Sequence, residues 1–181
     1  MTTALQDIPL KTIAGEDTSL AAWDGKVVLA VNVASKCGFT PQYEGLEKLY
    51  ADYSAKGLVV AGFPANDFGA QEPGTNEDIA TFCTTNFGVD FPMFEKITVT
   101  GPDKHPLYAE LTSAIPLGAA GDPLREKFKG YGMTPNADPE VLWNFEKFLI
   151  ARDGTVAARF PSTTAPDAPE LIAAIDAELA K

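Results

Sequence analysis

The sequence has few of the residues that build metal centres or disulfide frameworks. Its 181 residues include one histidine, His105, and two cysteines, Cys37 and Cys83. A zinc site with several imidazoles, a four-cysteine zinc site and a set of structural disulfides are all excluded. The thiols that remain are expected to stay free in a reducing compartment.

Basic residues and long apolar runs are also scarce. Lys and Arg number 14 against 25 Asp and Glu, so the formal net charge is −11. An acidic surface repels phosphate backbones and anionic lipids, so nucleic acid is not an expected partner. The residues before Asp7 lack a basic targeting region, and no apolar run approaches the ~18 residues of a membrane span. We therefore expect a cytoplasmic protein that does not act at a membrane.

The length and composition are those of an ordinary globular protein. Hydrophobic residues make up 45% of the chain and charged residues 22%. A chain of this length buries roughly 70% of its unfolded surface, enough for a core without disulfides. We expect a single domain over residues 1–181.

Two segments have the apolar, β-branched composition of strands that are buried on both faces, residues 26–33 (KVVLAVNV) and 58–63 (LVVAGF). A helix signal follows each of them. Thr40 is expected to cap the first helix, and Thr75 with Asp78 has the spacing of a capping box for the second.

The other predicted elements are short strands at 8–13 and 18–20, a helix at 105–113 opened by His105, strands at 144–151 and 155–160 joined at Asp153-Gly154, and a helix at 169–179. Residues 115–140 are rich in Gly, Pro and charge, and we interpret them as an irregular insertion. This order of elements predicts a thioredoxin-like α/β fold, with a central mixed sheet and helices on both faces.

Cys37 follows the first buried strand and precedes a helix. Ligands in open α/β sheets bind beyond the carboxyl ends of the parallel strands. A strand-to-helix loop also exposes main-chain N–H groups and the positive end of the helix, and Lys36 adds a cation. We interpret Cys37 as a reactive thiol, with an inert buried thiol as the alternative.

A reactive thiolate needs more than a helix terminus. The terminus contributes ~0.3–1 kcal/mol, whereas each charge-assisted hydrogen bond contributes ~1.5–3 kcal/mol. Gln71, Trp143 and Asn144 follow or precede the other central strands, so their N–H donors are expected at the same edge as Cys37. None is a strong base, so they would orient and stabilise; a core or capping role is the alternative for each.

Three segments resemble the signature blocks of the glutathione peroxidase family. They are residues 31–39 (VNVASKCGF), 63–74 (FPANDFGAQEPG) and 143–150 (WNFEKFLI). The resemblance extends over about residues 8–179. It implies a thioredoxin-like fold and the reduction of hydroperoxides, and it implies no metal, flavin or nucleotide cofactor.

The resemblance also assigns roles to individual residues. The family's peroxidatic position matches Cys37, where its best-known members carry selenocysteine, and its supporting Gln, Trp and Asn match Gln71, Trp143 and Asn144. Cys83 resembles the resolving cysteine of the selenium-free, thioredoxin-dependent branch. Packing as a small apolar residue is the alternative for Cys83.

The function expected from these residues is that of a thiol peroxidase in the response to oxidative stress. Hydrogen peroxide or an organic hydroperoxide would oxidise Cys37 to a sulfenic acid, which Cys83 would convert to a disulfide for thioredoxin to reduce. Alternatives are a peroxidase that uses glutathione directly, a peroxide sensor that passes its disulfide to a partner protein, and a thioredoxin-fold module without redox activity.

Overall fold

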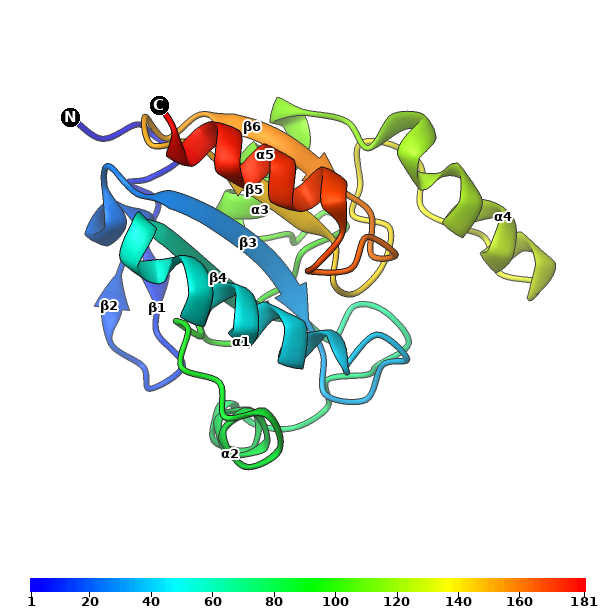
Figure 1. Cartoon of the computed structure of the whole chain (residues 1–181). Helices are drawn as coiled ribbons and strands as arrows, with labels where there is room; N and C mark the ends of the chain where they lie inside the picture. Colours follow the sequence, from blue (N-terminus) through cyan, green and yellow to red (C-terminus); the bar gives the residue numbers. More distant parts are fainter.

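A four-stranded sheet forms the centre of the computed structural model, which describes residues 1–181 (Figure 1). The strand order is β4-β3-β5-β6, in which β3 and β4 are parallel and the other neighbours are antiparallel. The strands are β3 (Val27–Val33), β4 (Leu58–Pro64), β5 (Lys147–Ile150) and β6 (Val156–Phe160). This is the mixed sheet that the order of elements predicts.

The register of the central strands brings the predicted site segments to one edge. In β3 and β4 every residue is buried, and the pairing runs from Val27 opposite Leu58 to Val33 opposite Pro64. Both strands therefore end at the same edge. Because β5 is antiparallel to β3, the segment that enters β5 arrives there too.

Helices cover both faces of the sheet, as predicted (Figure 1). The main helices are α1 (Gln42–Tyr53), α2 (Asn76–Phe87), α3 (Pro106–Ala114) and α5 (Pro169–Leu179). Buried side chains of α1, α2 and α5 share one core cluster with Leu29 of β3. Those of α3 share the other cluster with Val28, the next residue along, because neighbouring strand residues point to opposite faces.

The predicted insertion at 115–140 is wrong in part, because it contains a helix. A 3₁₀ turn (Gly118–Gly121) leads into α4 (Asp122–Gly130), which stands away from the sheet in Figure 1. Pro123 suits the first turn, and the i, i+4 pair Leu124 and Phe128 gives the helix one buried face. That pair was the available sequence signal, and the surrounding Gly, Pro and charge outweighed it.

The smaller predictions are confirmed with shifted bounds. The N-terminal strands are β1 (Leu10–Lys11) and β2 (Asp17–Thr18), followed by a 3₁₀ turn at Leu20–Trp23, and another 3₁₀ turn (Ser54–Lys56) follows α1. The capping box of α2 is present, and His105 caps α3 by accepting the N–H of Leu107 at Nδ1 (3.1 Å). No helix combines the length and apolar character that crossing a bilayer requires.

Candidate active site

Cys37 lies in the loop between β3 and α1, and Thr40 holds that loop in shape. The Thr40 hydroxyl accepts the N–H of Cys37 (2.9 Å) and donates to the carbonyl of Ala34 (2.8 Å). The expectation that Thr40 caps α1 is therefore wrong: i→i+3 bonds wind residues 37–41 into turns, Pro41 takes the N-cap position and α1 begins at Gln42. Thr40 shapes the cysteine loop instead.

The sulfur of Cys37 sits at the margin of the core. It accepts a main-chain hydrogen bond from Phe39 N–H, with a nitrogen–sulfur distance of 3.3 Å. Cys37 is 8% exposed, while Lys36 and Gly38 on either side are exposed. Cys83 is 2% exposed. Of the two cysteines, Cys37 is thus the more exposed.

Gln71 and Asn144 meet at this edge of the sheet. The Asn144 side-chain amide donates to Gln71 Oε1 (3.0 Å), and the main-chain carbonyl of Gln71 accepts the N–H of Lys36 (3.0 Å). Gly69 and Ala70 both have positive φ angles, of 66° and 52°, and turn the chain into Gln71. These hydrogen bonds join the loops that follow β3 and β4 to the segment that enters β5.

The structure shows no hydrogen bond from Gln71, Trp143 or Asn144 to the sulfur of Cys37. The donor that it shows is Phe39 N–H. Asn144 is fully buried, and its Oδ1 has no partner. Donation from these side chains to Cys37 or to a bound oxygen therefore stays a prediction.

Trp143 packs against two aromatic rings. Its ring centroid lies 5.4 Å from that of Phe68 and 4.8 Å from that of Phe128 on α4. Trp143 also borders the core cluster that contains Cys37. The insertion thus supplies part of the packing of a predicted site residue.

Asn32 in the middle strand holds the segment that carries Trp143 and Asn144. Its side-chain amide donates to the carbonyl of Trp143 (3.1 Å), and its main-chain carbonyl accepts the N–H of Phe145 (2.6 Å). Phe145 has a φ of 66°, which L residues rarely adopt, so β5 begins at Lys147 and not at the predicted Asn144. The two hydrogen bonds of Asn32 hold this strained turn in place.

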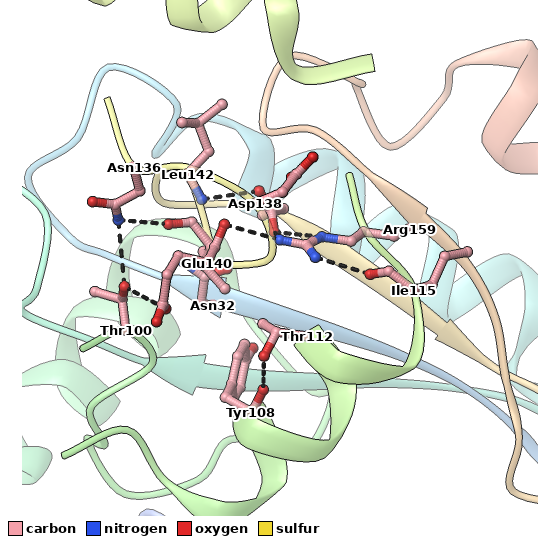
Figure 2. Close-up of polar contacts among 12 residues, drawn as sticks. Asn32, Thr100, Tyr108, Thr112, Ile115, Asn136, Asp138, Glu140, Leu142 and Arg159 are labelled. Carbon is pink, nitrogen blue, oxygen red and sulfur yellow. Dashed lines mark hydrogen bonds and ion pairs between the residues drawn. The ribbon is translucent and has the colours of Figure 1, made fainter. Parts of the chain in front are cut away.

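A buried ion pair also supports the segment that carries Trp143 and Asn144. Arg159 on β6 pairs with Glu146 (2.8 Å), and neither side chain is exposed. Figure 2 shows Arg159 also reaching the carbonyls of Ile115 (2.9 Å) and Glu140 (3.1 Å). Burial raises the pKa of Glu146, and the charge of Arg159 opposes that rise. The network fixes the chain that leads to Trp143.

Cys83 lies on α2 and is a free thiol, as is Cys37. Burial raises the pKa of the Cys83 thiol to about 11, although the neighbouring Tyr43 hydroxyl lowers it. The negative charge of Glu72 adds to the rise. At neutral pH Cys83 is therefore almost entirely protonated in this conformation.

A cavity separates the Cys37 loop from α2. It has a volume of about 300 Å³ and is lined by Ser35, Lys36 and Glu72 on one side and by Ile79 and Phe82 of α2 on the other. Burial raises the pKa of Glu72, and hydrogen bonds with Ser35 and the charges of Lys96 and Lys36 oppose that rise. Neither cysteine is among the residues that line this cavity.

The sequence matches a known family along more than half of its length. A family model described as glutathione peroxidase matches residues 5–112. The chain belongs to the glutathione peroxidase family. Its enzyme class is therefore that of a peroxidase, an oxidoreductase that acts on peroxides, as predicted.

Relatives within the glutathione peroxidase family align with nearly all of the chain. Thioredoxin/glutathione peroxidase BtuE of Escherichia coli (strain K12) is 47% identical over 174 residues, 95% of each chain. Glutathione peroxidase-like peroxiredoxin 2 of Saccharomyces cerevisiae is 47% identical over 92% of each chain. Hydroperoxy fatty acid reductase gpx1 of Synechocystis sp. is 45% identical over 84% of this chain and 83% of the relative.

Solved structures confirm the thioredoxin-like fold. The crystal structure of Trgpx in apo form superposes with a TM-score of 0.73 at 36% identity, covering 99% of this chain and 98% of that one. A thioredoxin family thiol:disulfide interchange protein from Chlorobium tepidum TLS has a TM-score of 0.59 at 14% identity, covering 95% of this chain and 92% of its own. The second likeness shows the fold alone.

Sequence reasoning missed Thr40 and Asn32 as parts of this candidate site. The available signal for Asn32 was a polar side chain in a strand that is otherwise apolar. A buried amide needs partners, and these could have been expected at the sheet edge. Thr40 gave no comparable signal, because a threonine before a helix is most simply interpreted as a cap.

Proposed function

We propose that the protein reduces hydrogen peroxide and organic hydroperoxides through Cys37 and Cys83 and is recycled by thioredoxin. The observation that carries this proposal is the placement of Cys37. The residue follows the carboxyl end of β3 with a main-chain N–H directed at its sulfur, and the preceding Lys36 bonds to Gln71, which pairs with Asn144. A thiol in such a loop is suited to be held as a thiolate.

In the first step the Cys37 thiolate attacks the terminal oxygen of the peroxide. The O–O bond breaks, the sulfur gains that oxygen as a sulfenic acid, and the departing oxygen takes up a proton to leave as water or an alcohol. Gln71, Trp143 and Asn144 are proposed to donate hydrogen bonds to the sulfur and to the departing oxygen. These neutral donors stabilise charge without moving a proton of their own.

In the second step the Cys83 thiol condenses with the Cys37 sulfenic acid. A disulfide forms and one water leaves, which carries the hydroxyl of the sulfenic acid and the proton of Cys83. A disulfide requires Cα atoms within ~7 Å, and Cys83 is buried and protonated on an intact helix. We therefore propose that α2 unwinds after the first step.

Thioredoxin is proposed to reduce the disulfide by thiol–disulfide exchange. The name of the E. coli relative includes both thioredoxin and glutathione, and that of the yeast relative describes a peroxiredoxin. The name of the Synechocystis relative supports organic hydroperoxides among the substrates. The cytoplasm, where thioredoxin is kept reduced, is the proposed compartment.

The decisive test compares two reductants and two cysteine variants. Consumption of NADPH is followed with thioredoxin and its reductase, and in parallel with glutathione and its reductase. We expect turnover with thioredoxin in the wild type and none in Cys37→Ser. In Cys83→Ser, turnover with thioredoxin should collapse, while one oxidation per chain, trapped as a sulfenic acid, should persist.

Other results would assign the chain differently. Unimpaired turnover with thioredoxin in Cys83→Ser would refute the resolving role. Faster turnover with glutathione than with thioredoxin would refute thioredoxin as the reductant. A wild-type protein that leaves peroxide unconsumed would refute the peroxidase itself, and a stable mixed disulfide with one partner would favour a sensor.

A further inference from the structure

Lys147 is a fully buried lysine without a carboxylate partner. It is the first residue of β5, its exposure is 0%, and its ammonium forms no ion pair. Its nitrogen donates to the carbonyl of Phe145 (2.7 Å), to Gln42 Oε1 (2.8 Å) and to the carbonyl of Ser162 (3.5 Å). Burying an ammonium is costly unless its hydrogen bonds are made, and an apolar side chain would fill a strand position at lower cost.

The partners of Lys147 connect the two halves of the site. Gln42 is the first residue of α1, which follows the Cys37 loop. Phe145 is the positive-φ residue that directly follows Asn144. Gln42 also donates to the carbonyl of Ser162 (2.8 Å), so the bridge is closed into a small network.

We propose that Lys147 is a positioning residue for the reaction at Cys37, because its ammonium ties the first turn of α1 to the strained turn that presents Asn144. This inference rests on the peroxidase function proposed above. Asn32 holds that turn through the carbonyl of Trp143 and the N–H of Phe145, and Lys147 holds it through the carbonyl of Phe145. Asn32 and Lys147 thus bind different main-chain groups of the same turn.

The groups that face Lys147 are almost all uncharged. Val31 of β3 and Phe160 of β6 lie opposite it in the sheet, and Gln42 faces it from α1. Glu146 is the charged group that acts on it, and as the preceding strand residue it points to the other face, where it pairs with Arg159. Burial lowers the pKa of Lys147 to about 7.

The test measures the rate constant for oxidation of Cys37 in single-turnover experiments with the full chain. Lys147→Met keeps the length of the side chain and removes the ammonium. We expect the rate constant to fall at least tenfold, on the order of the loss caused by small misplacements of reacting groups. Gln42→Leu removes one arm of the bridge, and a smaller loss is expected, so the test holds even if Lys147→Met fails to fold.

Arg152→Met is the matched control. Like Lys147, Arg152 donates three hydrogen bonds, in its case to the main-chain carbonyls of Gly25, Lys56 and Leu179, but it follows β5 at the opposite end of the sheet. The control should lose stability and keep the oxidation rate constant of the wild type. An equal loss of rate in Arg152→Met and Lys147→Met would overturn the positioning role.

A pH profile separates positioning from folding. Deprotonation weakens the charge-assisted bonds of Lys147, so between pH 6 and 8 the oxidation rate constant of the wild type, divided by that of Lys147→Met at the same pH, should fall. The division removes the pH dependence that the two proteins share. Identical profiles, or a wild-type rate constant in Lys147→Met, would overturn the inference, whereas a wild type whose Cys37 resists peroxide would refute the proposed function itself.

Discussion

Single side chains in this protein act mainly by holding main-chain groups in place. The Thr40 hydroxyl binds the N–H of Cys37 and the carbonyl of Ala34, and the Asn32 side-chain amide binds the carbonyl of Trp143, next to Asn144. Asn144 in turn holds Gln71 through one hydrogen bond. The side chains that are predicted to donate to Cys37 are therefore held in place before any peroxide binds, which is what electrostatic stabilisation requires.

The Gln71–Asn144 pair gives a prediction at this scale. Gln71→Ala and Asn144→Ala should each slow oxidation of Cys37 about tenfold or more, because each loses an oriented donor. The fold loss in the double variant should be smaller than the product of the fold losses in the two single variants, because either change breaks the same hydrogen bond. The corresponding coupling energy should be ~0.5–3 kcal/mol. Stopped-flow oxidation of Cys37 measures this.

Asn86→Ala, which removes an exposed amide from α2, serves as the control and should oxidise at the wild-type rate. Strict additivity of the two site substitutions would show that Gln71 and Asn144 act independently.

Among the secondary-structure elements, α2 has capped ends but few fully buried side chains between them. A capping box begins it and Gly88 in the left-handed region ends it. Only Ile79 and Cys83 are buried along its length, and its exposed surface carries several threonines, which are poor helix formers. The half-buried Phe82 and Phe87 also pack on Tyr43, so the proposed unwinding around Cys83 must break these contacts as well.

Strengthening α2 should slow formation of the disulfide. Replacing the exposed Thr81 and Thr85 by Ala stabilises the helix by roughly 0.6 kcal/mol each, so the step that follows oxidation should slow about eightfold in the double variant. Loss of free thiols after a single peroxide pulse measures this step. The preceding oxidation of Cys37 should be unchanged, and an undiminished rate of disulfide formation would show that α2 does not need to unwind.

The helix α4 is attached to the rest of the molecule by a few apolar side chains. Leu124 and Phe128 pack on Leu117, Leu142 and Trp143 in a small separate cluster. Phe128→Ala should weaken this attachment by about 3 kcal/mol, so hydrogen-exchange protection over residues 118–130 should fall about a hundredfold. Peroxidase activity should fall severalfold, because Trp143 loses one of its aromatic neighbours.

Lys127→Ala changes an exposed residue of α4 and is the control. Unchanged protection in Phe128→Ala would mean that other contacts hold α4 in place.

The molecule as a whole buries titratable groups that give its stability an unusual dependence on pH. The pKa of Lys147 is about 7 in the folded protein against an ordinary value of 10.5. Below pH 7 both folded and unfolded chains bind the proton. Between pH 7 and about 10 the unfolded chain binds more protons, so this residue makes the folded protein more stable as the pH rises.

Unfolding in urea at pH 7 and pH 9 tests this contribution. Between these pH values Lys147 should add about 2 kcal/mol to the stability of the wild type. Lys147→Met should lack this gain, and the difference between the two proteins cancels the contribution of Cys83 and other groups. Parallel changes in both proteins would show that Lys147 remains charged in the folded state.

The sequence by itself determined the elements and the placement of the chemistry. Apolar strands, the capping box of α2 and the turn at Asp153-Gly154 are local patterns, so the order of elements predicted the sheet. The positions of Cys37 and Gln71 after parallel strands followed from that order. The family motifs added the roles that these residues are proposed to have.

Only the tertiary structure decided which groups hold the site together. Asn32 forms a hydrogen bond with Trp143, which is 111 positions away in the sequence, and Lys147 forms one with Gln42, which is 105 positions away. A polar residue in an apolar strand signals that a partner exists, but its identity depends on the packing of distant segments. The same holds for α4, because only the packing of Phe128 against Trp143 links this helix to the site.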